Sequence, residues 1–185
     1  MTSSTLIPIT TEVLTMFSEK LLDAMNEQMK NEFLSGYLYL AMAGYFESED
    51  LPGLASWMRV QALEELTHGE KFFNFICEAG GRTDLRTVDA PQNDYASPLA
   101  CFAYALDHEK FVSASINKLM DQARQDNNHA AQIFLQWFVT EQVEEEATFG
   151  LIVKKLERIG DDGNGLLRLD EELAQRTFVP PAAEA

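Results

Sequence analysis

The most constraining feature of the sequence is a set of four long segments in which apolar residues recur every three or four positions. This period places apolar side chains on one face of an α-helix, so each segment predicts an amphipathic helix of about thirty residues. The connections between the segments are short, long and short. Because short connections join antiparallel neighbours, this order predicts an all-α four-helix bundle with one long crossover between the second and third helices.

Start and stop signals set the expected boundaries. Ser18 and Ser97 are placed as N-caps, and glycines follow the second and fourth segments. The predicted helices cover 18–47, 52–79, 98–126 and 129–159, with a short fifth C-terminal helix at about 166–176. The expected organisation is an N-terminal extension (1–17), one domain (18–176) and a C-terminal tail (177–185).

Composition narrows the class of protein. The chain has 185 residues and a formal charge of -16, which disfavours binding to nucleic acid or to an anionic membrane and favours cations as partners. Cys77 and Cys101 form no C-x-x-C pair, so neither a disulfide framework nor a thiolate zinc site is predicted. The start of the chain lacks the pattern of a signal peptide, and no apolar run is long enough to span a membrane. A cytoplasmic protein is expected.

Acidic residues interrupt all four apolar stripes near mid-height. A thirty-residue helix is about 45 Å long, so antiparallel neighbours of equal length bring their midpoints to one level. The predicted core positions at that level include four glutamates, Glu32, Glu65, Glu109 and Glu145.

Burying an ionised carboxylate costs several kcal/mol unless a positive charge compensates it. No Lys or Arg occupies the neighbouring stripe positions, so the sequence predicts a metal. Glu65 and His68 lie three residues apart on one helix face, which suits a bridging carboxylate and a terminal imidazole. Hard oxygen ligands with one imidazole favour iron or manganese, although zinc would also bind.

Four stretches, in this order and at these spacings, resemble the bacterial-type non-haem ferritins over residues 18–176: "NEQMKNEF", "LEELTH", "DHEKF" and "FLQWFVTEQVEEE". The resemblance implies a ferritin-like bundle and an iron-storage function. It also implies a ferroxidase that oxidises Fe(II) with dioxygen or peroxide at a di-iron centre. The ferric product would be stored as mineral in a hollow homo-oligomer of 24 subunits.

The resemblance also implies roles for the mid-height residues. Glu32 and His68 would be terminal ligands of the first iron, with Glu65 as the bridge. Glu109 and Glu145 would hold the second iron, with Gln142 beside it. Because the fourth helix offers Gln142 and Glu145 in place of a second E-x-x-H, the second iron should be held more loosely.

The resemblance extends to the residues around the centre. Leu66 stands where haem-binding relatives offer a methionine, so no haem is expected. Tyr39, seven residues after Glu32, is either a packing residue or an electron donor during oxygen reduction, and its hydroxyl is expected to approach a ligand carboxylate. Three further acids, each about 100° from the di-iron stripe, form either a solvated face or a third iron site: Glu64, Glu141 and Glu144.

Two other functions remain open from the residues alone. A rubrerythrin-like di-iron redox enzyme would normally add a cysteine-ligated iron domain, which Cys77 and Cys101 cannot build. A non-catalytic helical interaction protein would carry its buried acids incidentally. The apolar face of the expected fifth helix favours assembly into a larger particle.

Overall fold

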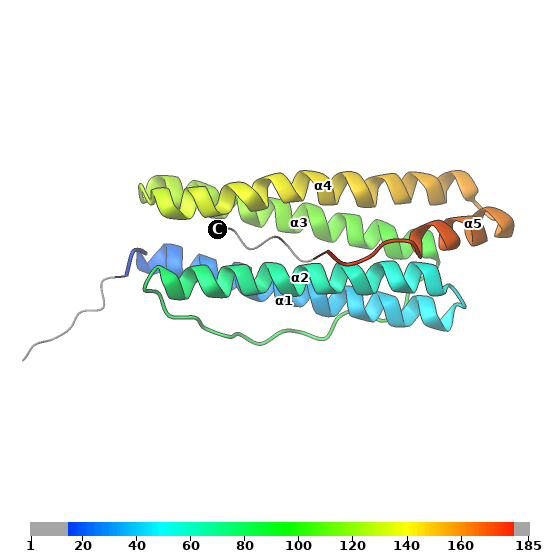
Figure 1. Ribbon diagram of the computed structural model, residues 1–185, viewed down its shortest axis with the longest axis horizontal. Helices are drawn as coiled ribbons and strands as arrows, with labels where there is room; N and C mark the ends of the chain where they lie inside the picture. Colours follow the sequence, from blue (N-terminus) through cyan, green and yellow to red (C-terminus); the bar gives the residue numbers. More distant parts are fainter. Residues whose placement is uncertain (1–14, 180–185) are drawn as a thin grey trace, which may run out of the picture.

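The computed structural model describes residues 15–179, in which the regular elements are five α-helices and no strand occurs. Most of the expected N-terminal extension (1–14) and the end of the tail (180–185) lie outside the described residues. The helices are α1 (Glu19–Ser48), α2 (Pro52–Glu78), α3 (Pro98–Gln125), α4 (His129–Ile159) and α5 (Gly163–Leu173). The pair α1–α2 lies beside the pair α3–α4, and α5 lies at one end of the bundle (Figure 1). The predicted bundle with one crossover is confirmed.

Side-chain caps begin most of these helices, as the sequence predicts for α1 and α3. Ser18 Oγ accepts a hydrogen bond from the backbone N–H of Leu21 at 3.1 Å, and Ser97 Oγ accepts one from Ala100 at 3.1 Å. Each cap satisfies an N–H that has no partner inside the helix. Within the described residues, no helix is both long enough and apolar enough to cross a membrane.

The expected limits of the fifth helix are wrong by three residues at each end. The prediction of 166–176 treated the glycine-rich stretch before it as a loop, but α5 already begins at Gly163. The cause is Asp162, whose side chain accepts a hydrogen bond from Asn164 N at 3.1 Å and caps the helix. Since α5 ends at Leu173, Arg176 lies beyond the helix.

The core consists of two apolar clusters separated by a polar layer. One cluster, at the α5 end, includes Phe46, Trp57 and Phe102, and the other includes Met25, Phe72 and Phe138. Between them lie buried polar residues from all four long helices, among them Gln28, Glu32, Gln61, Glu65, His68, Glu109, Gln142 and Glu145. The antiparallel packing therefore brings the helix midpoints to one level, as predicted.

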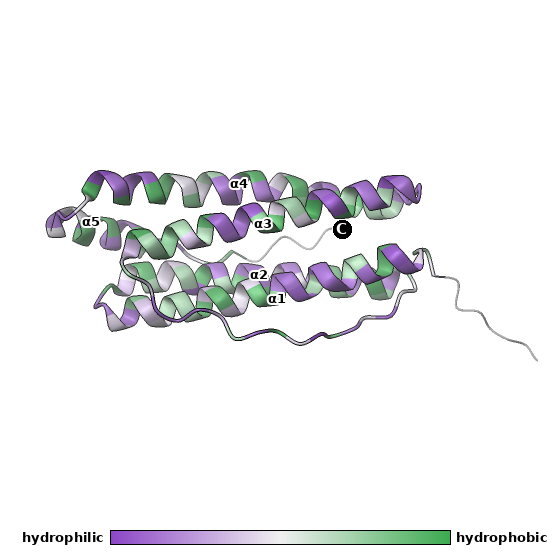
Figure 2. Cartoon of the chain, turned by 180° about the vertical axis from the view of Figure 1, so that it is seen from behind, coloured by the Kyte–Doolittle hydropathy of each residue, from purple (hydrophilic) through white to green (hydrophobic). Residues whose placement is uncertain are grey.

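The crossover between α2 and α3 runs along the bundle beside α1 (Figures 1 and 2). Asn26 holds its beginning, because its amide donates to Arg82 O at 3.1 Å and accepts from Asp84 N at 2.7 Å. Arg86 then forms an ion pair with Glu27 at 2.8 Å. Close to α3, Tyr95 packs edge-on against Tyr45 of α1. The long connection is thus fixed to the helix that it passes.

Candidate metal centre

Among the described residues, two glutamates and a histidine form a group that could hold a metal ion. Glu32 of α1 and Glu65 and His68 of α2 each offer a ligand atom, and these atoms all lie within 4.8 Å of one another. His68 Nδ1 lies 3.5 Å from Glu65 Oε2, as the three-residue spacing on one helix face predicts. All three residues are buried. Carboxylate oxygens with one imidazole form a donor set suited to iron.

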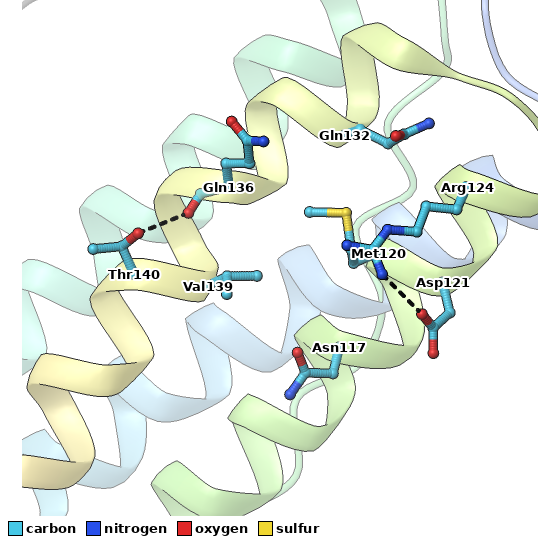
Figure 3. A pocket seen from close by; sticks show the side chains of 8 residues that line it. All are labelled: Asn117, Met120, Asp121, Arg124, Gln132, Gln136, Val139 and Thr140. Atoms are coloured by element: carbon cyan, nitrogen blue, oxygen red, sulfur yellow. Dashed lines mark hydrogen bonds and ion pairs between the residues drawn. The ribbon is translucent and has the colours of Figure 1, made fainter.

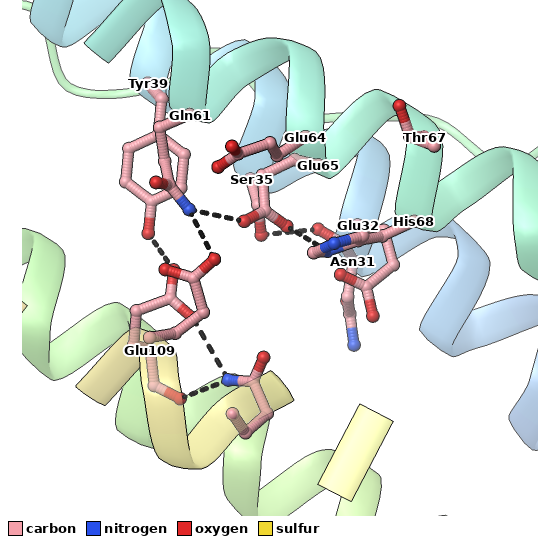
Figure 4. A network of polar contacts seen from close by, with 12 residues as sticks. Asn31, Glu32, Ser35, Tyr39, Gln61, Glu64, Glu65, Thr67, His68 and Glu109 are labelled. Atoms are coloured by element: carbon pink, nitrogen blue, oxygen red, sulfur yellow. Dashed lines mark hydrogen bonds and ion pairs between the residues drawn. The ribbon is translucent and has the colours of Figure 1, made fainter. Parts of the chain in front are cut away.

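Glu109 of α3 extends this cluster (Figure 4), and Glu145 of α4 is joined to it through Gln61. One oxygen of Glu109 accepts a hydrogen bond from the Tyr39 hydroxyl, and the other accepts one from Gln142 Nε2 at 3.0 Å. Glu145 accepts a hydrogen bond from Gln61 Nε2 at 2.9 Å. The sequence-predicted ligands of both metal positions therefore occupy one connected network.

Gln61 and Gln28 are site residues that the sequence reasoning missed. Gln61 Nε2 also lies 3.2 Å from Glu65 Oε1, so this amide joins α2 to α4 across the centre. Gln28 Nε2 donates to Glu32 at 2.8 Å. Each amide precedes its glutamate by four residues, which is one helical turn. This spacing was the available signal, but a buried amide does not by itself call for a metal.

Burial controls the protonation of these carboxyl groups. It raises the pKa of Glu32 and of Glu145 to about 8, and that of Glu109 to about 7. Burial, together with the charges of Glu109 and Glu145, raises the pKa of Glu65 well above its ordinary value. Without a metal, burial therefore favours the protonated forms of these carboxyl groups.

No Lys or Arg in the described part of the chain forms an ion pair with any of these four glutamates. A cation that replaced their protons would find a preformed set of oxygen ligands without a competing ammonium or guanidinium group. The donor chemistry therefore fits a hard or borderline divalent metal.

Tyr39 occupies the position that helical geometry predicts. Its ring stacks against Phe149 with 5.5 Å between the centroids, and its hydroxyl reaches Glu109 as expected. Burial, followed by the charge of Glu109, raises the pKa of the phenol well above its ordinary value. Tyr39 therefore remains a neutral hydrogen-bond donor.

The three flank acids differ in their surroundings. Glu64 is half-buried and forms an ion pair with Arg176, while Glu141 is half-buried and Glu144 is exposed. Burial raises the pKa of Glu64, and the nearby charge of Glu141 raises it further, whereas Arg176 lowers it. The structure thus adds a basic residue to this flank that the sequence analysis did not foresee.

A groove of about 560 Å³ between α3 and α4 lies apart from this centre (Figure 3). Its lining includes Asp121 and Arg124, which pair with each other at 3.7 Å. None of the expected site residues lines it. The buried polar layer, and not this groove, is the candidate metal centre.

Comparisons with known proteins identify the family of this chain. A family model described as the ferritin-like domain matches residues 22–159. A bacterial non-heme ferritin of Staphylococcus aureus is 42% identical over 163 residues, which cover 88% of this chain and 98% of the relative. This chain belongs to the ferritin family. The ferritin of Staphylococcus epidermidis is 41% identical with the same coverage.

Solved ferritin structures have the same fold. An engineered closed form of the Archaeoglobus fulgidus ferritin superposes with a TM-score of 0.87 at 48% identity, covering 88% of this chain and 99% of that one. A structure described as a novel open-pore ferritin from the same archaeon gives a TM-score of 0.86 at 48% identity, covering 87% and 99%. The resemblance found in four short sequence stretches therefore extends over the whole bundle.

Proposed function

We propose that this ferritin is a ferroxidase, which oxidises Fe(II) at a di-iron centre inside each subunit and stores the ferric product as mineral. The observation that carries the proposal is the buried cluster of Glu32, Glu65 and His68, whose ligand atoms lie within 4.8 Å of one another. Such a cluster is costly to bury without a metal. Membership of the ferritin family supports iron as that metal.

Each carboxylate has a distinct role in this proposal. Glu32 and His68 are terminal ligands of the first iron, Glu65 bridges the pair, and Glu109 and Glu145 hold the second iron. Gln142 already donates to Glu109, so it orients that ligand and lies beside the second iron. Because the second position has no imidazole, its iron is the more easily released.

The chemistry balances with dioxygen as the oxidant. Two Fe(II) ions give up one electron each, and dioxygen takes both electrons with two protons to form hydrogen peroxide. With peroxide as the oxidant, the same two electrons and two protons form two molecules of water. The carboxyl groups of Glu32, Glu109 and Glu145, whose pKa values lie at about 7 to 8, release protons as iron binds. Reduction of dioxygen to two molecules of water instead takes four electrons and four protons. Two electrons would come from the iron pair, one from a third Fe(II) on the flank, and one from Tyr39, which would lose its phenolic proton and become a tyrosyl radical.

Glu64, Glu141 and Glu144 form an auxiliary iron site on the flank of the centre in this proposal. The effect of Glu141 on the pKa of Glu64 supports their proximity. Iron leaving the second position would meet these acids before it reaches the mineral. Twenty-four subunits would enclose that mineral, and the apolar residues exposed on α1 and α2, including Tyr37, Leu40 and Leu66, support an extensive subunit contact.

Aerobic addition of Fe(II) to apo-protein tests the proposal. We expect a fast rise in ferric absorbance at up to two iron ions per subunit, followed by slower mineral growth, in a particle whose native mass corresponds to 24 chains. Iron that oxidises no faster than in buffer would contradict the ferroxidase assignment. A monomeric or dimeric mass would contradict the shell.

A further inference from the structure

The chain beyond α5 turns back toward the middle of the bundle and brings Arg176 to the flank of the metal centre (Figure 1). Arg176 Nη1 donates to Gln61 Oε1 at 2.7 Å, and Nη2 forms an ion pair with Glu64. The guanidinium also lies over the Trp57 ring, 4.4 Å from its centroid. The three partners lie on one face of α2, because Gln61 follows Trp57 by four residues and Glu64 follows Gln61 by three. The guanidinium is therefore bound by hydrogen bonds, charge and stacking together.

The start of this arm is fixed by the docking of α5. Asp170 Oδ1 accepts a hydrogen bond from Leu54 N at 2.8 Å, and the backbones touch closely enough that a Cβ on Gly53 would lie 1.9 Å from Asp170 O. Leu173 is buried in the neighbouring apolar cluster. Arg176 follows Leu173 by only three positions, so the arm holds the guanidinium close to α2.

The contact with Gln61 determines which way its amide faces. A guanidinium has donors only, so it accepts no hydrogen bond and must face the carbonyl oxygen of the amide. Gln61 Nε2 is then directed at Glu65 and Glu145. Reversal of this amide would place its oxygen against two carboxyl groups. Arg176 therefore acts on both halves of the centre through one side chain.

The contact with Glu64 places a positive charge on the route out of the centre. The side chains of Arg176 and Glu64 are each 24% exposed, so their attraction is screened less than that of a fully exposed pair. A guanidinium stays charged at every physiological pH. Arg176 Nη2 bonds Oε2 of Glu64, so a metal ion that takes that oxygen must displace the guanidinium.

We propose that Arg176 is a positioning residue of the metal centre and a tethered cation that competes with iron for Glu64. The inference rests on the proposed function, since it assigns the control of the flank site. While the arm is docked, Gln61 faces the centre and Glu64 is closed to metal. Iron that moves onto the flank displaces the guanidinium from Glu64 and from Trp57.

Titration of intact apo-protein with Zn²⁺ tests the competition, because Zn²⁺ binds carboxylates and undergoes no oxidation. Arg176→Gln should increase the Zn²⁺ affinity of a weak flank site about tenfold, which is the effect expected when one competing charge-assisted contact of ordinary strength is removed. Adding Glu64→Gln to that variant should remove the gain. Arg176→Lys keeps the charge and should bind Zn²⁺ at the flank more weakly than Arg176→Gln. Arg168→Gln, an identical change at an exposed position of α5, should titrate like the parent.

Several results would overturn the inference. Unchanged Zn²⁺ affinity in Arg176→Gln would do so, and so would a gain that persists without Glu64. If Arg176→Gln fails to fold, Trp137→Phe offers a second test, because it leaves Trp57 as the single tryptophan and keeps Arg176. The fluorescence emission of Trp57 should change as Zn²⁺ fills the flank site. Constant emission at saturation would contradict the displacement of Arg176. A parent protein that binds Zn²⁺ as expected but oxidises no Fe(II) would contradict the proposed function alone.

Discussion

The hydroxyl of Tyr39 donates a hydrogen bond to Oε1 of Glu109 and thereby joins α1 to α3 at the level of the metal centre. This contact stabilises the ionised form of Glu109, because it partly offsets the effect of burial, which leaves the pKa of Glu109 raised to about 7. It also places a buried phenol one hydrogen bond away from a proposed ligand of the second iron. A redox role and an orienting role are therefore both accessible to the same group.

Tyr39→Phe separates these roles, because it preserves the ring and removes only the hydroxyl. We expect the first oxidation of iron to continue at a reduced rate and the tyrosyl radical signal on freeze-quenching to disappear. The pKa of Glu109 should rise above about 7, since it loses a hydrogen bond that favours the charged form. Tyr37→Phe, an exposed neighbour on α1, serves as the matched control. Identical kinetics and an undiminished radical signal would return Tyr39 to packing.

Glu65→Ala should abolish rapid Fe(II) oxidation. Loss of a bridging carboxylate weakens both metal positions at once, so the fall in initial rate should be at least about 100-fold, the upper end of effects measured for residues that only orient ligands. Stopped-flow ferric absorbance gives the rate. Glu70→Ala, an exposed acid on α2, provides the control. Parent-like oxidation by the Glu65 variant would show that the centre is assigned to the wrong residues.

Gln61→Leu should weaken metal binding without removing a ligand. The change deletes the amide that reaches Glu65 and Glu145, so affinity at the second position should fall by about 10–100-fold. Gln136→Leu makes the same change at an exposed position of α4. Anaerobic Fe(II) calorimetry on both variants measures the difference, and equal affinities would exclude an orienting role for Gln61.

Much of this site follows from the sequence, because helical period and equal helix lengths fix both the buried face and the level of each residue. Helical period and helix length were sufficient to predict the positions of Glu32, Glu65, Glu109 and Glu145. The position of Arg176 could not be predicted in this way. It depends on how the short fifth helix packs against α2, and hydrophobic periodicity does not predict that packing. The misplaced start of α5 had a local cause, the Asp162 cap within a glycine-rich stretch.

The raised pKa values predict how the apo-protein responds to pH. Glu32 and Glu145 titrate at about 8 in the folded chain, compared with 4.5 ordinarily, so between these values the folded state binds more protons than the unfolded state. Stability of the apo-protein should therefore fall as pH rises through this window. Thermal melts at pH 6 and pH 8 check the direction.

Bound metal should reverse the pH dependence of stability. Because bound metal requires ionised carboxylates, metal affinity should increase from pH 6 to pH 8, with more protons released on binding at the lower pH. Calorimetry in two buffers of different ionisation enthalpy counts these protons. A Glu145→Gln variant should release fewer of them. Proton release that is the same at both pH values would contradict the assignment of protonated carboxyl groups to the apo centre.

Assembly should depend on an apolar patch formed by Tyr37, Leu40, Leu63 and Leu66, whose exposed fractions are 51%, 49%, 46% and 43%. Tyr37 and Leu40 lie three positions apart on one face of α1, and Leu63 and Leu66 do so on α2. A Cβ added to Gly36 of α1 would lie 3.3 Å from Leu66 Cγ, so Leu66 lies close to α1 next to Tyr37. An exposed patch of this kind marks a contact surface.

Leu66→Glu introduces a charge at the centre of that patch, which a subunit contact would have to bury without a partner. We expect the native mass to fall from that of a shell to that of small oligomers, while the helical circular dichroism stays close to the parent spectrum because Leu66 is not part of the buried core. Leu66→Met, which conserves volume and polarity, should assemble normally. Native mass spectrometry distinguishes the outcomes. A glutamate variant that still forms the parent-sized particle would place the subunit contact on another face of the bundle.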